Sequence, residues 1–373
     1  MHVVILTTSY PRFDGDPGGH FVAAQANALT RAGAEVQVIA PGCAPHVEQR
    51  GGIEVHWVGG TTAFGMPGVA ARFVAAPLAA SLDVMGTSRV FARKVRELTE
   101  SRTRPPDRVL AHWLVPTVWP ALLRLRYEGR VDAFAHGGDV RLLVGMPEAL
   151  RHAVVSRIVR RATSLHFASH SLAELLLGSV RDPAIAKALQ GIARVDPPTL
   201  EIPQELHSRS LRRETRARWH AEWPLPANAF VAVAVGRLVD SKRVDLAIDA
   251  LQTNPTTHLV VIGDGPARHA LEARAEKHGQ RVRFAGMLHR REALTAMAAA
   301  DVLVHPSALE AAPSVVREAR ALGIPVVACG AGDIPRWATE DAAIRCVEHD
   351  AVAIAAAIRE LAQTRDGIVQ LTK

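Results

Sequence analysis

The sequence lacks several features that would assign it to a specialised class of protein. No apolar run reaches eighteen residues, so no membrane-spanning helix is expected. Aromatic residues make up only 5% of the chain and do not interleave with a basic stripe, which argues against nucleic-acid binding. The three cysteines, Cys43, Cys329 and Cys346, lack metal-ligand spacing, so we expect reduced structural thiols. No positively charged signal region precedes the first apolar stretch, so we expect a cytoplasmic protein.

Length and composition are those of a soluble globular protein, and charge does not define a function. Its 373 residues are enough for two domains of ordinary size, and 48% hydrophobic content is typical of a globular protein. The formal net charge is +7. A basic balance suits an anionic substrate or an anionic membrane surface, and charge alone does not separate the two.

Short apolar runs alternate with helical patterns along the chain, which predicts an α/β protein with parallel sheets. We predict strands over 2–8, 34–40, 53–58, 107–112, 131–136, 164–168, 230–235, 258–262, 281–284, 301–304 and 324–328. We predict helices over 19–31, 69–82, 84–100, 148–161, 243–251, 266–278, 290–299, 314–322 and 351–363, and one near 117–127.

The predicted domain boundary lies where this alternation stops. Residues 196–228 are rich in proline and carry a charged run over 209–218, so we predict a linker with at most one short helix. The predicted domains are then 1–195 and 229–373.

The most informative stretch is 301–328, which reads as strand, loop, helix, turn and strand. Pro313 suits the first helical position, and Gly323 is a stop signal. The free N–H groups of Ser314 and Val315 at the helix start would attract a diphosphate. Glu318, one turn further on, can accept hydrogen bonds from ribose hydroxyls, and Glu310 can do so from a sugar. The alternative is a solvated helix residue and a simple loop charge.

Residues 310–319 resemble the signature of the retaining glycosyltransferases of family four, in which two glutamates are separated by seven residues. The resemblance implies the GT-B fold, with two Rossmann-like domains whose parallel sheets face a central cleft. It implies that the first domain binds an acceptor and the second a nucleotide-linked sugar. It also implies that Glu318 binds the nucleotide ribose and that Glu310 contacts the donor sugar. Ala311 stands where the family commonly has glycine, and residues 332–336 depart from the family's usual G-G-I-x-E.

Residues 236–242 are similar to the family's G-R-L-x-x-x-K element. The resemblance implies that Arg237 and Lys242 hold the donor diphosphate beside Gly236. One arginine fork and one lysine charge nearly neutralise such a group. An exposed loop with routine basic residues is the alternative. By the same resemblance Gly265 lies near the nucleotide base, although its short motif alone predicts only a turn.

In the first domain, a loop rich in glycine precedes the helix at 19–31. The resemblance implies that Gly18 and Gly19 lie close to the donor phosphates, whereas His20 either reaches the acceptor or is an ordinary loop histidine. Residues 14–16 superficially match a metal-binding D-x-D. The surrounding chain resembles the fold that needs no such metal, so we predict no metal site and no cofactor.

Residues 136–139 match the family's H-G-x-D element at the end of a predicted strand. The resemblance implies that His136 hydrogen-bonds the donor sugar, and that Asp139 either lies near the acceptor or braces the loop. His112, at the end of the preceding strand, is a further acceptor-binding candidate. A structural role is the alternative for each histidine.

The resemblance therefore implies a metal-independent, retaining hexosyltransferase. It would move a sugar from a UDP- or GDP-linked donor to a hydroxyl, in bacterial surface-glycan or natural-product biosynthesis. Lipid-linked saccharides, aglycones and soluble sugars all remain open as acceptors. A sugar-nucleotide 2-epimerase and a non-catalytic nucleotide-sugar-binding protein are the alternatives. The first would act without an acceptor, and the second would release no nucleotide.

Two further expectations concern the surface and the end of the chain. The predicted helix 84–100 is basic and amphipathic, so it either contacts an anionic membrane, which would place the protein at the inner membrane surface, or packs on the core with a solvated face. The terminal helix that family members fold back onto the first domain is expected to be short or absent here.

Overall fold

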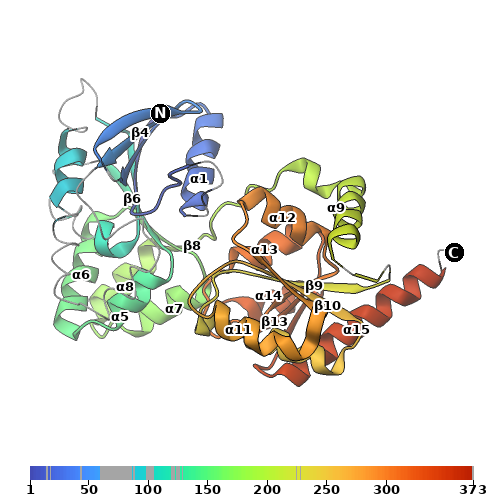
Figure 1. Ribbon diagram of the computed structural model, residues 1–373. Helices are drawn as coiled ribbons and strands as arrows, with labels where there is room; N and C mark the ends of the chain where they lie inside the picture. The colour runs from blue at the N-terminus through green and yellow to red at the C-terminus, as the bar shows by residue number, and fades with distance from the viewer. Residues whose placement is uncertain are drawn as a thin grey trace. The chain divides into compact units, whose positions relative to one another are not determined.

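The computed structural model of the chain describes residues 1–13, 16, 18–42, 44–58, 86, 89–97, 105–118, 122, 127, 129–223, 225–226 and 228–371. The chain divides into two compact units, Met1–Thr199 and Leu200–Lys373 (Figure 1). The helix predicted over 69–82 lies outside the described residues, as do Asp14, Gly15 and Cys43. Of the helix predicted over 84–100, residues 89–97 are described and helical.

The first unit is built on a mostly parallel sheet. Its described strands are β1 (His2–Leu6), β2 (Glu35–Pro41), β3 (His46–Arg50), β4 (Ile53–Val58), β5 (Arg108–His112), β6 (Arg130–Ala135), β7 (Ser164–Phe167) and β8 (Ala193–Val195). They pair in the order β3-β4-β2-β1-β5-β6-β7-β8, and only β3 and β4 pair antiparallel. Counted in chain order without β3 and β8, the six remaining strands follow the Rossmann order 3-2-1-4-5-6.

Helices of the first unit pack on this sheet through narrow apolar faces. The described ones are α1 (His20–Arg31), α5 (Gly138–Val144), α6 (Glu148–Arg161), α7 (His170–Gly178) and α8 (Pro183–Ile192). In α1, Val22 and Ala26 are one turn apart and pack in one cluster with Val3 and Ile5 of β1. The sheet and α1 therefore share the core that positions the loop between them.

The second unit repeats the same plan with a fully parallel sheet. Its strands are β9 (Phe230–Val235), β10 (Thr257–Ile262), β11 (Val282–Gly286), β12 (Val302–His305), β13 (Val326–Cys329) and β14 (Ile344–Val347). Their order, β11-β10-β9-β12-β13-β14, is again 3-2-1-4-5-6 in chain order. The described α-helices are α9 (Arg209–Glu222), α10 (Val244–Asp249), α11 (Arg268–Ala275), α12 (Arg290–Ala299), α13 (Ser314–Ala321), α14 (Ile334–Glu340) and α15 (Ala351–Leu371).

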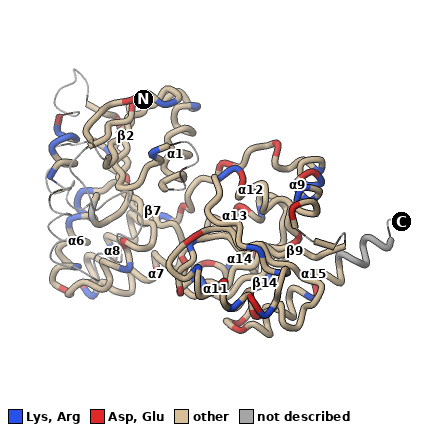
Figure 2. The backbone as a smooth tube through the Cα atoms, viewed as in Figure 1, with Lys and Arg blue, Asp and Glu red and all other residues tan. Residues whose placement is uncertain are grey.

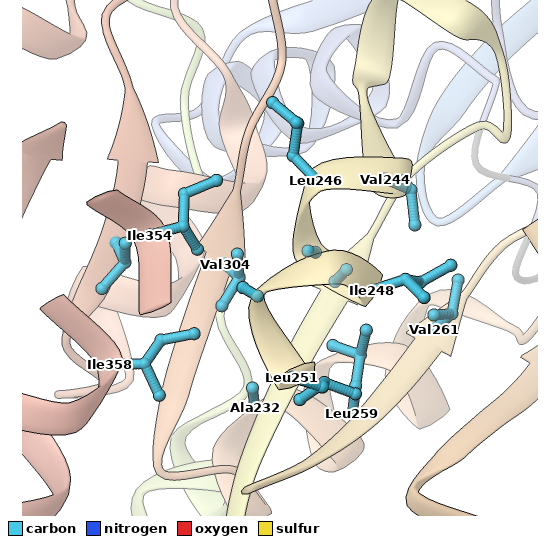
Figure 3. Close-up of a cluster of buried hydrophobic side chains, with 14 of the residues drawn as sticks. Ala232, Val244, Leu246, Ile248, Leu251, Leu259, Val261, Val304, Ile354 and Ile358 are labelled. Atoms are coloured by element: carbon cyan, nitrogen blue, oxygen red, sulfur yellow. The ribbon is translucent and has the colours of Figure 1, made fainter. Parts of the chain in front are cut away.

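Two apolar clusters bury the two faces of the second sheet. Alternate residues of β9 point to opposite faces, as the period of a strand requires. Ala232 belongs to the cluster that also contains Ile354 of α15 (Figure 3), and Val231 belongs to the cluster that contains Met297 of α12. Because both faces are covered, the sequence of β9 is apolar throughout, and no polar alternation marks it.

Residues 200–228, which the sequence analysis assigns to a linker, lie within the second unit. A 14-residue helix, α9, occupies half of them and packs beside α12 (Figure 2 shows its mixed charges). Arg212 and Arg216 of α9 form ion pairs with Asp301. Trp223 packs in the apolar cluster that contains Met297 of α12. The arginines of the charged run therefore attach this segment to the second unit.

Several elements escaped the sequence analysis, chiefly short ones. They are β3, β8, β14, α5, α7, α8 and α14, none longer than ten residues. Of the helix predicted near 117–127, residues 117, 118, 122 and 127 are described. A π-helical turn, Leu114–Val118, includes the first two, and Leu122 is helical. Pro313 is the residue before α13 rather than its first residue, while Gly323, with φ of 75°, follows its end as predicted.

Candidate functional site

In each unit the strand order reverses between the first and fourth strands of the Rossmann series. In the second unit, α10 and α13, the helices that follow β9 and β12, pack in different apolar clusters on opposite faces of the sheet. The carboxyl ends of these two strands therefore form a switch point, where α/β proteins bind ligands. The loops after these two strands carry Arg237, Lys242 and Glu310. The structure therefore brings the predicted residues of these two motifs to one end of one sheet.

Lys242 and Glu310 form the centre of this arrangement. The Nζ atom of Lys242 lies 2.5 Å from Oε1 of Glu310, and Nε2 of His305 lies 2.9 Å from the same oxygen. Burial raises the pKa of Glu310, but the hydrogen bond from His305 and the charge of Lys242 outweigh it and lower the pKa to about 2. Glu310 is therefore a carboxylate at neutral pH and can accept hydrogen bonds.

Arg237 stands apart from this cluster. Its side chain is exposed, and it makes no hydrogen bond or ion pair with any described residue. It is therefore available to a ligand anion. Arg243, where the resembled family often has glycine, has a φ of 49° and pairs with Asp245. The left-handed backbone explains the preference for glycine at this position.

The start of α13 lies after the loop that carries Glu310. Ser314 is its first residue and Pro313 precedes it without a side-chain cap. The N–H groups of the first turn are left to other partners, as at any helix start. Glu318 is buried one turn further in, with its Oε1 atom 2.7 Å from Nη1 of Arg290 at the start of α12. The sequence analysis missed Arg290, since only the fold brings it to Glu318.

The glycine turns of this unit hold the loops at this end of the sheet together. Gly265 has a φ of 159°, and a Cβ atom there would lie 2.3 Å from the carbonyl oxygen of Leu238. The loop after β10 thus packs directly on the loop after β9, which begins at Gly236. Gly265 has a structural reason to be glycine, and its predicted contact with a nucleotide base stays a prediction.

In the first unit, three aromatic side chains stack across neighbouring strands. His112, Phe134 and His166 are register partners on β5, β6 and β7. The rings of His112 and Phe134 lie 4.7 Å apart, and those of Phe134 and His166 lie 4.6 Å apart. His136 follows β6, and its Nε2 atom lies 2.9 Å from Nδ1 of His112. The two predicted site histidines are therefore direct neighbours.

Burial keeps both of these histidines neutral. It lowers the pKa of His136 to about 3, and burial together with the nearby His136 and His166 lowers the pKa of His112 well below its usual value. His112 is only 2% exposed, so its imidazole meets His136 rather than solvent. The predicted contact of His112 with an acceptor stays a prediction.

Asp139 braces the loop after β6. Its Oδ1 atom accepts hydrogen bonds from the backbone N–H groups of His136 and Gly137, and its Oδ2 atom accepts one from Leu114. The side chain is 2% exposed. Burial raises its pKa, while these backbone hydrogen bonds act to lower it. Of the two predicted roles, the contacts match the brace rather than acceptor binding.

The loop before α1 is organised by Asp16. Its carboxylate accepts hydrogen bonds from the N–H of Gly18 and from Arg12, and the pKa of Asp16 is lowered because these bonds outweigh burial. Gly19 caps α1 with a φ of 71°, and His20 begins the helix. Within the described residues, no group of three or more histidine, cysteine or acidic side chains could hold a metal ion.

The helical segment 89–97 has its apolar side buried, at Phe91, Ala92 and Val95. Arg89, Arg93 and Arg96 are exposed. The described contacts match the packed alternative for this helix. No helix among the described residues is long and apolar enough to cross a bilayer.

Comparison with known proteins finds similarity to one family over part of the chain. Residues 215–369 match the family described as "Glycosyl transferases group 1". The Bacillus subtilis (strain 168) protein named as the teichuronic acid biosynthesis glycosyltransferase TuaC is 29% identical over 255 residues, which cover 66% of this chain and 59% of TuaC. The chain spans only part of the length of the first curated relatives that it matches. The aligned segments cover 59%, 41% and 21% of three of these proteins.

Solved structures match almost the whole chain. Sucrose-phosphate synthase from Thermosynechococcus elongatus aligns with a TM-score of 0.71 and 19% identity, covering 96% of this chain and 89% of that one. HepE from Anabaena, solved in complex with UDP-glucose, aligns with a TM-score of 0.65 and 20% identity, covering 98% and 91%.

The fold is therefore that of a GT-B glycosyltransferase, and the predicted α/β fold class is confirmed. The second unit is similar in sequence to the glycosyl transferases of group 1, and the aligned segment of 255 residues is similar to TuaC.

Proposed function

We propose that the chain is a retaining glycosyltransferase that moves a sugar from a UDP- or GDP-linked donor to an acceptor hydroxyl. One observation carries the proposal: exposed Arg237, the Lys242–Glu310 pair and the start of α13 meet at the switch point of a Rossmann sheet. A nucleotide diphosphate sugar offers two negative charges, a ribose and a hydroxylated sugar. The basic side chains and the helix start suit the two negative charges, and the glutamates suit the ribose and the sugar hydroxyls.

The donor diphosphate would lie on Arg237, Lys242 and the backbone N–H groups of Ser314 and Val315. Lys242 is held by Glu310 in the free protein, so an incoming diphosphate competes for its charge. Arg237 has no such competitor among the described residues. We therefore expect Arg237 to make the larger contribution to nucleotide affinity.

The ribose would lie on Glu318. Arg290 donates a hydrogen bond to Oε1 of Glu318, whereas Oε2 has no hydrogen-bond partner among the described residues. A carboxylate can accept several hydrogen bonds, so Glu318 can bind Arg290 and a ribose hydroxyl at once. The glutamate–arginine pair also fixes the side chain before the nucleotide arrives.

The donor sugar would contact Glu310, and His136 in the first unit is proposed to act on the same sugar. Gly18 and Gly19 are proposed to approach the donor phosphates, and His20 the acceptor. Glu310 is ionised at neutral pH, so it accepts hydrogen bonds from sugar hydroxyls rather than donating a proton.

The proposed reaction needs no enzyme nucleophile. The bond between the anomeric carbon and the diphosphate oxygen breaks, and the acceptor oxygen bonds to the same face of that carbon. The acceptor proton passes to the departing phosphate. Arg237, Lys242 and the start of α13 stabilise the negative charge that grows on that phosphate, which is catalysis by positioning and electrostatics.

For the acceptor we propose a hydroxyl of a growing bacterial surface glycan. TuaC, which carries the name of teichuronic acid biosynthesis, supports this choice. Lipid-linked and soluble saccharides of that kind are the first acceptors to supply.

The test is to incubate the protein with a panel of UDP- and GDP-sugars, with and without surface-glycan acceptors. We expect nucleotide release that depends on the acceptor, and a product whose anomeric configuration by NMR equals that of the donor. An inverted product would contradict retention. A new nucleotide sugar formed without acceptor would indicate a 2-epimerase instead. Binding without release with any acceptor would indicate a sensor.

A further inference from the structure

A small polar cavity lies behind His136 in the first unit. It has a volume of about 40 Å³ and is lined by α1, the ends of β5 to β7 and the segment 196–199. Gln25 and His112 face into it, and neither Oε1 of Gln25 nor Nε2 of His112 has a hydrogen-bond partner among the described residues. A cavity of this size holds water, and a water molecule needs two or more polar partners of this kind.

The contact between the two imidazoles has the geometry of a well-aligned hydrogen bond. The ring planes of His112 and His136 differ by 9°, with centroids 5.1 Å apart and the two nitrogens 2.9 Å apart. The N–H and the lone pair of an imidazole lie in its ring plane. In coplanar rings, the N–H of one ring can therefore point directly at the lone pair of the other. One of the two nitrogens must donate and the other accept.

A neutral imidazole carries its proton mainly on Nε2, and the cavity accommodates this form of His112. A water that accepts from Nε2 of His112 and donates to Oε1 of Gln25 then satisfies both buried atoms. A proton on Nε2 leaves Nδ1 of neutral His112 with a lone pair. His136 must then carry its proton on Nε2, and its Nδ1 atom bears a lone pair. Nδ1 has no partner among the described residues, and His136 is partly exposed.

We propose that His112 is a positioning residue, which holds His136 in the Nε2–H tautomer so that Nδ1 of His136 accepts a hydrogen bond from a substrate hydroxyl. The proposal rests on the proposed glycosyl transfer for its substrate. The tautomer itself is a property of the free protein. His112 does not touch the substrate, and its effect passes through His136.

The test uses histidine labelled with 15N in the full chain, with the His136 resonances assigned as those lost in His136→Asn. The free protein should show protonated Nε2 and unprotonated Nδ1 on His136. His112→Phe keeps the stacking on Phe134 but removes the acceptor, so His136 should become a mixture of tautomers. His112→Asn restores an acceptor, because its Oδ1 atom is attached to Cγ as Nδ1 is, and should restore the single tautomer.

A matched control is His166→Phe, which makes the same replacement on the side of Phe134 opposite His112, at a residue that has no hydrogen bond to His136. It should leave the His136 tautomer unchanged. In kinetics, His112→Phe should lower kcat/KM roughly two- to tenfold, as for one lost hydrogen bond, and His112→Asn should recover most of that loss.

Two results would overturn the proposal: an Nδ1–H tautomer of His136 in the free protein, or an unchanged tautomer in a folded His112→Phe variant. Thermal melting of each variant establishes that it is folded. If no donor is turned over by the unmodified protein, the proposed function fails while the tautomer measurement still decides the role of His112.

Discussion

At the scale of single residues, Glu310 shows how neighbours define a chemical role. An isolated loop glutamate is a solvated charge, and the sequence leaves that alternative open. In the fold its carboxylate is buried against Lys242 and His305. These partners keep it ionised despite burial, which makes it a hydrogen-bond acceptor for a polyhydroxylated ligand and also a contributor to stability.

The low pKa of Glu310 predicts how stability depends on pH. Its pKa falls from 4.5 to about 2 on folding, so its stabilisation is complete above pH 4.5 and is lost as the pH falls toward 2. Glu310→Gln should lower the free energy of unfolding by about 3 kcal/mol at neutral pH. Urea unfolding of both proteins between pH 7 and 3 should show this difference shrink below pH 5. A difference independent of pH would contradict the assignment.

Arg237 gives a test that separates binding from stability. Because its exposed side chain makes no hydrogen bond or ion pair with described residues, Arg237→Ala should leave the melting temperature unchanged. The substitution should weaken the binding of UDP or GDP about tenfold or more, because a charge-assisted hydrogen bond is lost. Isothermal titration calorimetry measures this affinity. Arg213→Ala removes another exposed arginine of the second unit and is the control. Equal affinities in both variants would remove Arg237 from the site.

At the scale of elements, the loop between β12 and α13 is held by the segment that precedes α14. The N–H of Asp333 donates to the carbonyl oxygen of Ala311, and Gly332 lies against the same carbonyl with a φ of 58°. A Cβ atom at Gly332 would lie 2.2 Å from that oxygen. The position of Glu310 therefore depends on a glycine more than twenty residues away.

Gly332→Ala should destabilise the protein by about 2–3 kcal/mol and weaken nucleotide binding, because the Ala311 carbonyl must move. Gly323→Ala is the matched control: its φ is 75°, but nothing lies within 4 Å of the added Cβ, so only the backbone cost of about 1 kcal/mol is expected. Chemical denaturation and calorimetry measure both effects. Similar losses of nucleotide affinity in the two variants would show that the Ala311 contact has no special role.

Sequence patterns predicted the long, regular elements best. The apolar run of β9 and the helices α6 and α12 have the predicted bounds, because their burial imposes a clear period. Short helices such as α14 and the antiparallel β3 carry too few residues to show one. In α9, the arginines suggested an exposed linker, whereas their partner Asp301 lies 85 or more residues away in sequence.

The site was predictable to the extent that each motif is local. Residues 236–242 and 310–318 were found as separate segments, and the strand order brings them together. The partners His305 and Arg290 were not found. His305 ends a predicted strand beside the motif, which was a usable signal, but the Arg290–Glu318 pair spans 28 residues and depends on how α12 packs. The cavity behind His136 likewise depends on three strands and a helix.

At the scale of the whole molecule, both units use one strand order. The second unit places Arg237, Lys242 and Glu310 after the first and fourth strands of that series, whereas the first unit places its glycine loop after the first strand and His136 after the fifth. The first unit supplies neutral histidines and glycine loops, and the second supplies positive charge and two carboxylates. This division matches a reaction in which one unit holds an anionic donor. The central claim is therefore about the second unit: the diphosphate lies between Arg237, Lys242 and the start of α13, with the ribose on Glu318.

A crystal structure of the chain soaked with UDP or GDP tests that claim most directly. We predict diphosphate oxygens within hydrogen-bond distance of Arg237, Lys242 and the Ser314 amide. We also predict a hydrogen bond from a ribose hydroxyl to the carboxylate of Glu318. A nucleotide bound elsewhere, with these four groups left without ligand, would contradict it.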